Sequence, residues 1–330
     1  MLSIFRTNQL LASFLLVFYL AILHAPAWLA SPTYSLPAVG FLGQFIYEHI
    51  SPDGYLGRIL TILIVLFQAF FINVLVRDFR LSREINLFPG LFFALIASSF
   101  PEFLVLSPVH LANTFLLVAF YQIANTYRRS SSAAGLIFNA GFWIGIASFI
   151  YPSYILFGLY IVVGLETLRA LRMGEVLIAL CGLVTPYLLA GAAFFWFDEL
   201  PYLYRLQFVE GLALGDFPSP DLSLLNIIRL GLYGLILLIV LFSFNLYKFK
   251  KVIQVQKRIS LLYWMLIVGF FTMLIQGNIQ MDHLLVLAIP LGIFLSFNIS
   301  EGSPNWAALW HFLLFGVILL LHFYPIVLSV

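Results

Sequence analysis

Long apolar runs alternate with short polar breaks along the whole chain. Most runs reach about 18 residues or more, the length at which a helix crosses the hydrocarbon core of a bilayer. Backbone amides cannot bond to lipid, so such runs form helices. The pattern therefore predicts an all-α fold, a polytopic transmembrane helical bundle in which residues 1–330 are a single integral membrane domain. We expect about eleven spans, over residues 9–28, 58–76, 87–106, 108–127, 133–150, 153–168, 175–197, 224–247, 260–276, 283–299 and 306–328.

Two of the polar breaks, residues 29–57 and 198–223, are longer than a turn requires. In the first, Gln44 and Glu48 lie four apart above apolar neighbours, which predicts an amphipathic helix lying on the membrane surface. In the second, residues 202–212 have the character of a short interfacial helix. Long loops often carry function, so candidate sites are sought here.

A few residues within the spans predict how the helices pack. Gly141 and Gly145 form a small-xxx-small pair that would let two helices approach closely. Pro186 and Pro290 fall within spans and are expected to kink them. Cys181, the only cysteine, lies in an apolar run and is expected to be a small core residue.

The composition agrees with a chain whose main solvent is lipid. Hydrophobic residues make up 63% and charged residues 9%, and the mean hydropathy of +1.05 exceeds that of soluble domains. The net charge of +2 is too balanced to favour nucleic acid as a partner. The lipid bilayer is the expected surrounding.

The positions of the charges predict the orientation. With the N-terminus in the cytoplasm, all but three of the 16 Lys and Arg residues fall on the inner side. Most acidic residues then fall on the outer side, where Trp28 and Trp196 would join an aromatic belt. We therefore predict a cytoplasmic N-terminus.

Three carboxylates are the catalytic candidates: Glu48 and Asp53 in the first long loop, beside His49, and Glu102 in the second outer turn. Partial desolvation at a membrane rim can raise a carboxyl pKa and produce a general base toward a hydroxyl. The alternative is that these carboxylates are solvated loop residues that help to set topology.

A second set of candidates would bind substrate. Asp282 and His283 begin the tenth span and His110 lies near the start of the fourth, so imidazole and carboxylate at one depth could bind a phosphate or a metal. Their spacing matches no known ligand pattern, so no metal site is assigned and the cofactor is left open. The alternative is that they are ordinary helix-end residues.

The three outer basic residues, Arg58, Arg205 and Arg229, oppose the general charge bias. Arg205 is the preferred contact for a lipid phosphate. The alternative is pairing with a nearby acid, and the candidates are Asp53, Glu210 and Asp221.

Three segments resemble a known family: RLSREINLFPGLFFALIASSFPEFLVLSP (Arg80 to Pro108), FNAGFWIGIASFIYPSYILF (Phe138 to Phe157) and GLVTPYLLAG (Gly182 to Gly191). They look like an integral-membrane family of Bacteroidetes-type bacteria with no established activity. The resemblance implies a multi-pass protein of the bacterial cytoplasmic (inner) membrane.

The layout is also similar to the GT-C class of membrane glycosyltransferases. That resemblance implies transfer of a sugar or related group from a polyprenyl-phosphate lipid on the outer side of the membrane. Glu48 or Asp53 would take the catalytic position and Glu102 a second one, while Arg205 and His283 would neutralise the leaving phosphate. The alternatives are a non-catalytic subunit of an envelope secretion, motility or assembly complex, and a lipid or small-solute transporter. The scarcity of charge deep in the spans disfavours the transporter.

Overall fold

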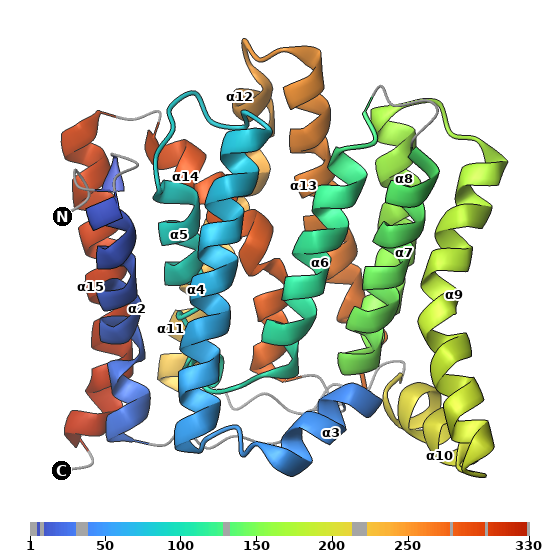
Figure 1. Cartoon of the computed structure of the whole chain (residues 1–330). Coiled ribbons are helices and arrows are strands. Elements are labelled where there is room, and N and C mark those ends of the chain that lie inside the picture. The colour runs from blue at the N-terminus through green and yellow to red at the C-terminus, as the bar shows by residue number, and fades with distance from the viewer. Residues whose placement is uncertain are drawn as a thin grey trace.

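The computed structural model describes residues 5–6, 10–30, 39–127, 133–212, 223–277, 280–300 and 303–328. In this part of the chain the helices stand side by side as a bundle (Figure 1). No strand occurs among these residues, which confirms the all-α prediction. The longer helices are α2 (Leu10–Leu29), α4 (Tyr55–Asp78), α6 (Pro108–Ala124), α7 (Ala133–Ile150), α8 (Phe157–Leu168), α9 (Met173–Trp196), α11 (Leu224–Phe242), α13 (Ile253–Thr272), α14 (Ala288–Ser300) and α15 (Pro304–Leu328).

Seven helical segments of the described chain are long and apolar enough to cross a membrane. They lie in α2, α4, α7, α9, α11 and α15, and in α14 together with the 3-10 helix before it, η4 (Met281–Leu287). Helices α6 and the run formed by η2 (Pro152–Leu156) and α8 are apolar but shorter. The described chain is therefore helical, and several of its helices have the length and composition of membrane-crossing helices.

The segment predicted to span over 87–106 is not one continuous helix. Helix α5 covers only Phe88–Ile96, about 14 Å at 1.5 Å per residue. A turn and the 3-10 helix η1 (Pro101–Leu104) follow it. Phe100 has extended backbone, with φ −117° and ψ 149°, the conformation favoured before a proline, so Pro101 prevents α5 and η1 from forming one helix. Every residue of α5 is buried, so this short helix is a core element.

The predicted close packing of small residues occurs between α7 and α9. A Cβ added to Gly141 would lie 2.3 Å from the carbonyl oxygen of Ala179, and one added to Gly182 would lie 2.2 Å from that of Phe138. No side chain fits at such distances. Pro186 lies inside α9, as predicted, whereas Pro290 is the third residue of α14, where the missing N–H has no partner within the helix.

The prediction that Cys181 is a core residue is wrong, because its side chain is exposed. Helix α9 lies at the edge of the bundle and packs mainly against α7 (Figure 1). Most of its surface is consequently uncovered, and an apolar sequence cannot distinguish a lipid-facing helix from a buried one.

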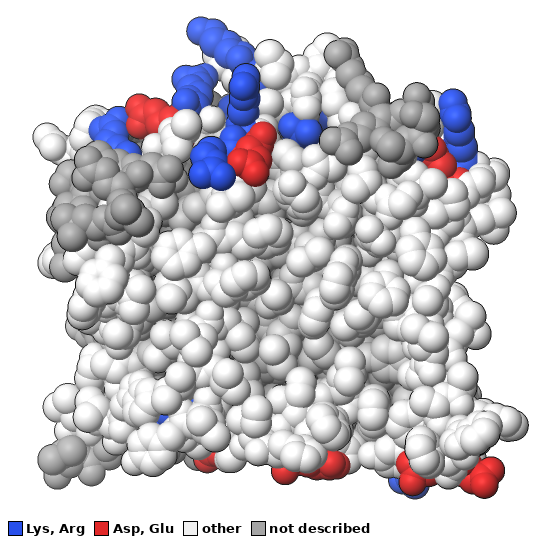
Figure 2. Space-filling view, in the orientation of Figure 1, with Lys and Arg blue, Asp and Glu red and all other residues white. Residues whose placement is uncertain are grey.

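The charged residues gather at the two ends of the bundle, with a broad belt between them that shows neither sign on the face in Figure 2. The end near the N-terminus, here called the basic end, holds all described Lys and Arg except Arg58, Arg205 and Arg229. The opposite, acidic end holds the described acids Glu48, Asp53, Glu102, Asp198, Glu199, Glu210 and Asp282. Residues 128–129, 216, 221 and 301, also used for the orientation, lie outside the described residues.

Candidate functional site

Helix α3 (Phe41–His49) lies across the acidic end, at a steep angle to the long helices (Figure 1). Its polar strip is as predicted, since the Gln44 side-chain amide donates to the Glu48 carboxylate over 3.1 Å. The helix is held against the end of α7, where the Gly40 N–H donates to the carbonyl oxygen of Ile150 over 3.0 Å. A Cβ on Gly43 would lie 2.6 Å from the same oxygen, so this close approach requires glycine.

The candidate residues Glu48, His49 and Asp53 are exposed and have partners close in sequence. The Nδ1 atom of His49 lies 2.8 Å from the carbonyl oxygen of Phe45. The Ser51 hydroxyl donates to Asp53 over 2.7 Å. That hydrogen bond, the backbone at Asp53 and the charge of Arg58 hold the pKa of Asp53 below its ordinary value of 3.8. This direction is opposite to the raised pKa expected for a general base.

Glu102 lies in η1, where it interacts electrostatically with Arg229 of α11. The Arg229 guanidinium is buried and donates to Asn226 over 2.8 Å and to the carbonyl oxygen of Leu321 over 2.7 Å. Arg229 therefore ties α11 to α15 rather than facing lipid phosphate.

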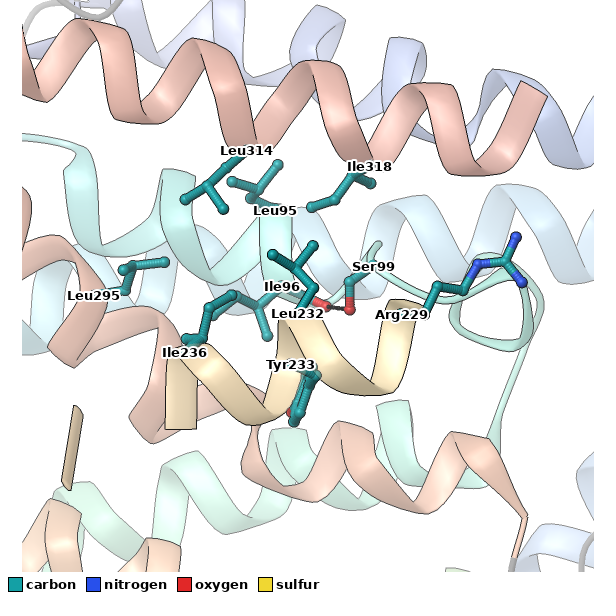
Figure 3. Close-up of a pocket in the computed structure, with 10 residues that line it drawn as sticks. All are labelled: Leu95, Ile96, Ser99, Arg229, Leu232, Tyr233, Ile236, Leu295, Leu314 and Ile318. Atoms are coloured by element: carbon teal, nitrogen blue, oxygen red, sulfur yellow. Dashed lines mark hydrogen bonds between the residues drawn. The ribbon is translucent and has the colours of Figure 1, made fainter. Parts of the chain in front are cut away.

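A small cavity lies along the same face of α11 as Arg229 (Figure 3). The cavity measures about 10 Å³, room for at most one water molecule. The Ser99 hydroxyl in its wall donates to the carbonyl oxygen of Ile96 over 2.8 Å (Figure 3). This part of the core is accordingly a packing region and not a ligand site.

The other two arginines of the acidic end also contact protein groups. Arg205 donates to the Glu210 carboxylate over 2.7 Å, one of the pairings left open by the sequence. The Arg58 guanidinium lies 5.7 Å from the centre of the Trp28 ring, a cation–π distance. Of these two arginines, Arg205 has the exposed side chain.

Asp282 and His283 form the centre of a buried polar cluster at the acidic end. Asp282 accepts a hydrogen bond from the Ser107 hydroxyl over 2.7 Å. His283 lies 2.7 Å from the Tyr151 hydroxyl and 3.1 Å from that of Thr272. All five residues are fully buried, and we call them the interior polar cluster. The sequence indicated only two of its members, since the others join from distant segments.

Helix α3 covers this cluster from the acidic end. The Tyr47 hydroxyl donates to the carbonyl oxygen of Leu106, the residue before Ser107, over 3.0 Å. Tyr47 and Tyr151 are also close enough to interact electrostatically. Glu48 follows Tyr47 in α3 but is exposed, so the structure separates the surface carboxylates Glu48 and Asp53 from the buried pair Asp282 and His283.

His110 is fully buried near the start of α6. It neighbours His24 of α2, whose Nε2 lies 3.3 Å from the Ser98 hydroxyl. The Nε2 of His322 in α15 lies 2.9 Å from the carbonyl oxygen of Ser98. Among the described residues no three His, Cys, Asp or Glu side chains are arranged to hold a metal ion. His24 and His322 thus connect α2 and α15 to the turn after α5, whereas neither ring nitrogen of His110 has a hydrogen-bond partner in the described part of the chain.

An apolar groove opens between α9 and the second long loop, with a volume of about 620 Å³. The loop contributes α10 (Leu200–Tyr204) and the π-helical segment Arg205–Glu210. The apolar groove is lined by Ile155, Leu183, Val184, Tyr187, Gly191, Leu200, Pro201, Leu203, Tyr204 and Phe208. The sequence indicated the loop as a candidate region but not the groove, which needs α9 as its second wall.

Tyr187 of the groove wall belongs to a set of hydrogen bonds with the buried residues Ser148 and Gln207, which do not line the groove. The Tyr187 hydroxyl lies 2.6 Å from the Ser148 hydroxyl. The Gln207 amide donates to the carbonyl oxygen of Ser148 over 2.6 Å and accepts from the Phe41 N–H over 3.4 Å. The Phe41 ring also packs edge-on against Phe194, with centroids 4.8 Å apart. The start of α3 is thus fastened to the groove.

These features define a helical protein with several helices that could cross a membrane, an apolar groove at its acidic end and a buried polar cluster at the same end. Comparisons with family models, curated proteins and solved structures find no match for the chain.

Proposed function

We propose that this protein is a membrane enzyme that acts on a polyprenyl-phosphate-linked substrate, in the manner of a GT-C-like glycosyltransferase. The observation that supports the proposal is the apolar groove. Its volume of about 620 Å³ falls within the roughly 300–1,000 Å³ of small-molecule sites. Hydrocarbon walls suit an isoprenoid chain and offer little to a sugar or an ion.

The proposal includes an orientation. The chain crosses the bacterial cytoplasmic membrane about eleven times, with the basic end in the cytoplasm and the acidic end outside. The support is the distribution of Lys and Arg described above, since basic loops are retained on the cytoplasmic side. The apolar groove then lies in the outer leaflet.

A lipid chain can reach the groove from the side. The outer surface of α9 exposes large apolar side chains, among them Leu188 and Phe195, 67% and 69% exposed, so this helix faces lipid. Arg205 directly follows Tyr204 of the groove wall. Arg205 would release Glu210 and bind the phosphate of the lipid, while the isoprenoid chain of the lipid occupies the groove.

Helix α3 would bring the catalytic group to the bound phosphate. Its first residue, Phe41, contacts Gln207 and Phe194 beside the groove, and Glu48 lies two turns further along. In this scheme Glu48 accepts the proton of the acceptor hydroxyl, and Asp53 and Glu102 help to orient the acceptor. The lowered pKa of Asp53 makes Glu48 the preferred base.

The proposal is tested by filling the groove. Gly191 lines it, and a Cβ there meets nothing within 4 Å, so Gly191→Phe places a ring in the groove without a backbone clash. Native mass spectrometry of the purified chain with added polyprenyl phosphate should show a bound lipid, and Gly191→Phe should lower its occupancy about tenfold or more, since a ring in the groove removes most of the buried apolar contact.

The matched control is Gly174→Phe, at the other end of the same helix, where a Cβ also meets open space. Binding should be unchanged in that variant. Absence of bound polyprenyl phosphate, or equal loss in both variants, would contradict the proposal.

A second candidate function, a non-catalytic subunit of an envelope complex, is favoured by the local pairing of the surface acids. Glu48 and Asp53 are exposed and satisfied by Gln44 and Ser51, as expected of a docking surface. The two functions differ in the response to Glu48→Gln. An enzyme loses transfer activity, whereas a scaffold keeps its partners.

A further inference from the structure

The 3-10 helix η2 contacts both the interior polar cluster and the apolar groove. The hydroxyl oxygen of Tyr151, its N-cap residue, lies 2.7 Å from Nδ1 of His283 in the cluster. Ile155, near the other end of η2, lines the groove. Tyr154 donates to the side-chain oxygen of Asn113 over 2.7 Å and so ties η2 to α6. A movement of η2 would therefore alter the cluster and the groove together.

The second long loop rests on η2. A Cβ added to Gly211 would lie 2.4 Å from Cγ of Pro152, so the backbone of the loop touches the first residue of η2. Gly211 directly follows the π-helical segment Arg205–Glu210, which carries the groove residue Phe208. Two parts of the groove lining thus depend on the position of η2, one through Ile155 and the other through this contact.

A helix as short as η2 has little stability of its own. It is five residues long, and the side chain of its N-cap residue makes no capping bond. The 3-10 geometry also gives poorer hydrogen bonds than an α-helix. Side-chain contacts with neighbouring helices must therefore fix its position, and the contact between Tyr151 and His283 fixes its N-terminus.

The hydrogen atoms around His283 are assigned from the available acceptors. The Thr272 hydroxyl donates its only hydrogen to the carbonyl oxygen of Gly269 over 2.6 Å, because two oxygens so close would repel without a hydrogen between them. Towards Nε2 of His283, 3.1 Å away, this hydroxyl therefore only accepts. Nε2 then carries the ring hydrogen, and Nδ1 accepts from Tyr151. The three side chains form a chain of hydrogen bonds that runs in one direction.

We propose that Thr272 and His283 are positioning residues of the apolar groove. Thr272 fixes the tautomer of His283, and His283 in that tautomer holds Tyr151 and with it η2. All three side chains are fully buried and do not line the groove, so they act through η2 and not by touching a ligand. This role rests on the proposed function, because it takes the groove as the site of the polyprenyl chain.

Two substitutions of Thr272 separate its hydroxyl from its shape. Thr272→Ser keeps the acceptor for Nε2 of His283, whereas Thr272→Val keeps the shape and removes the acceptor. In native mass spectrometry with polyprenyl phosphate, Thr272→Val should weaken lipid binding about fivefold, the usual effect of losing one neutral hydrogen bond. Thr272→Ser should bind the lipid like the unmodified chain.

Two further measurements need no lipid. The ring ¹⁵N shifts of His283 should show the hydrogen on Nε2 in the unmodified chain and in Thr272→Ser, and partly on Nδ1 in Thr272→Val. Hydrogen–deuterium exchange of residues 153–157 should be about fivefold faster in Thr272→Val than in Thr272→Ser. Tyr151→Phe removes the hydroxyl that donates to His283 and should speed exchange to the same extent.

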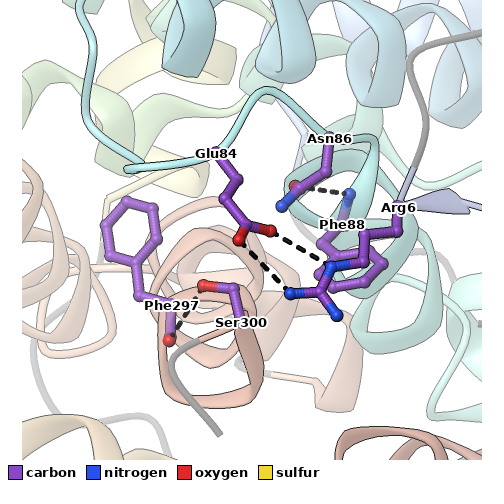
Figure 4. Close-up of polar contacts among 6 residues, drawn as sticks. All are labelled: Arg6, Glu84, Asn86, Phe88, Phe297 and Ser300. Carbon is purple, nitrogen blue, oxygen red and sulfur yellow. Dashed lines mark hydrogen bonds and ion pairs between the residues drawn. The ribbon is translucent and has the colours of Figure 1, made fainter. Parts of the chain in front are cut away.

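Ser300→Ala is the matched control. The Ser300 hydroxyl also donates to the carbonyl oxygen three residues earlier, that of Phe297, over 3.1 Å, but at the far end of α14 (Figure 4). Its removal should leave lipid binding, the nitrogen shifts of His283 and the exchange of η2 unchanged.

Equal behaviour of Thr272→Ser and Thr272→Val, whether both are normal or both impaired, would overturn the proposal, and so would impairment of Thr272→Ser alone. A ring hydrogen on Nδ1 of His283 in the unmodified chain would do the same. If the unmodified chain binds no polyprenyl phosphate, the proposed function fails. The nitrogen shifts and exchange rates then still decide whether Thr272 and His283 position η2.

Discussion

At the scale of single residues, the acidic end contains two kinds of carboxylate. Asp53 is exposed and bonded to the Ser51 hydroxyl, whereas Asp282 is fully buried and accepts from Ser107. A carboxylate inside a membrane protein is costly unless it is hydrogen-bonded, so Ser107 offsets part of the burial of Asp282. Asp53 is exposed, so water solvates its carboxylate. The hydrogen bond from Ser51 therefore acts mainly on the pKa of Asp53.

The lowered pKa of Asp53 gives a prediction for its partner. Because the folded-state pKa lies below the ordinary value of 3.8, Asp53 adds stability above that pH, and the contribution is lost as the pH falls through the folded-state pKa. Ser51→Ala should raise the pKa of Asp53 toward 3.8, as followed by the carboxyl ¹³C shift during an acid titration. Ser260→Ala, whose hydroxyl donates to the carbonyl oxygen of Gln256, is the control. An unchanged or lower pKa in Ser51→Ala would refute the assignment.

At the scale of elements, the contact between α7 and α9 depends on backbones that touch. Gly141 and Gly145 on α7 meet Ala179 and Leu183 on α9, and Gly182 meets Phe138 in return. In lipid, helices associate chiefly through such packing, since the surrounding chains are as apolar as leucine. Helix α9 has few other contacts, so this seam holds one wall of the apolar groove in place.

A side chain in this seam should separate the two helices. Gly182→Leu is expected to destabilise the protein by about 1–3 kcal/mol, the usual cost of overpacking. Gly174→Leu, in the same helix but facing open space, should change the thermal unfolding midpoint little. The thermal unfolding midpoints of both variants, measured in the same detergent, test whether the contact between α7 and α9 is tight. Equal midpoints would mean that the seam is not tight.

At the scale of the whole molecule, charged residues lie at two ends, and the belt between them shows no Lys, Arg, Asp or Glu on the face in Figure 2. This arrangement fits a bilayer, and the difference in charge between the ends favours one orientation. The orientation can be read by cysteine labelling along α9, after Cys181→Ser removes the native thiol. Met173 and Trp196, at opposite ends of α9, are 75% and 83% exposed.

A membrane-impermeant maleimide should label Trp196→Cys from the outside of right-side-out vesicles and Met173→Cys only in inside-out vesicles. Vesicles opened with detergent serve as the control, since both thiols must then react. The reverse pattern would place the apolar groove in the inner leaflet and contradict the proposed function.

Much of the architecture could be predicted from the sequence, because lipid imposes simple rules. An apolar run of sufficient length must become a helix, a small residue every fourth position permits close packing, and Gln44 with Glu48 needs only helical periodicity to form a polar strip. The exceptions are local. Residues 87–106 form the short helix α5 and the 3-10 helix η1 in place of one long helix. The prediction for Cys181 was wrong because uniform hydrophobicity carries no information about which side of a helix is buried.

The candidate sites were predictable only in part. Asp282 and His283 were recognised as polar residues at a helix end, yet their partners Ser107, Tyr151 and Thr272 come from other segments and have no sequence signal of their own. The apolar groove likewise needs walls from separate segments, since α9 and the second long loop form it together.

The sequence by itself determined the class of the molecule, its helices and the distribution of charge along the chain, since each follows from short-range periodicity or from transfer between water and lipid. Only the tertiary structure decided which polar groups are buried together, which apolar faces stay open and where space is left between helices. Those outcomes depend on contacts between residues far apart in the chain, which no local pattern specifies.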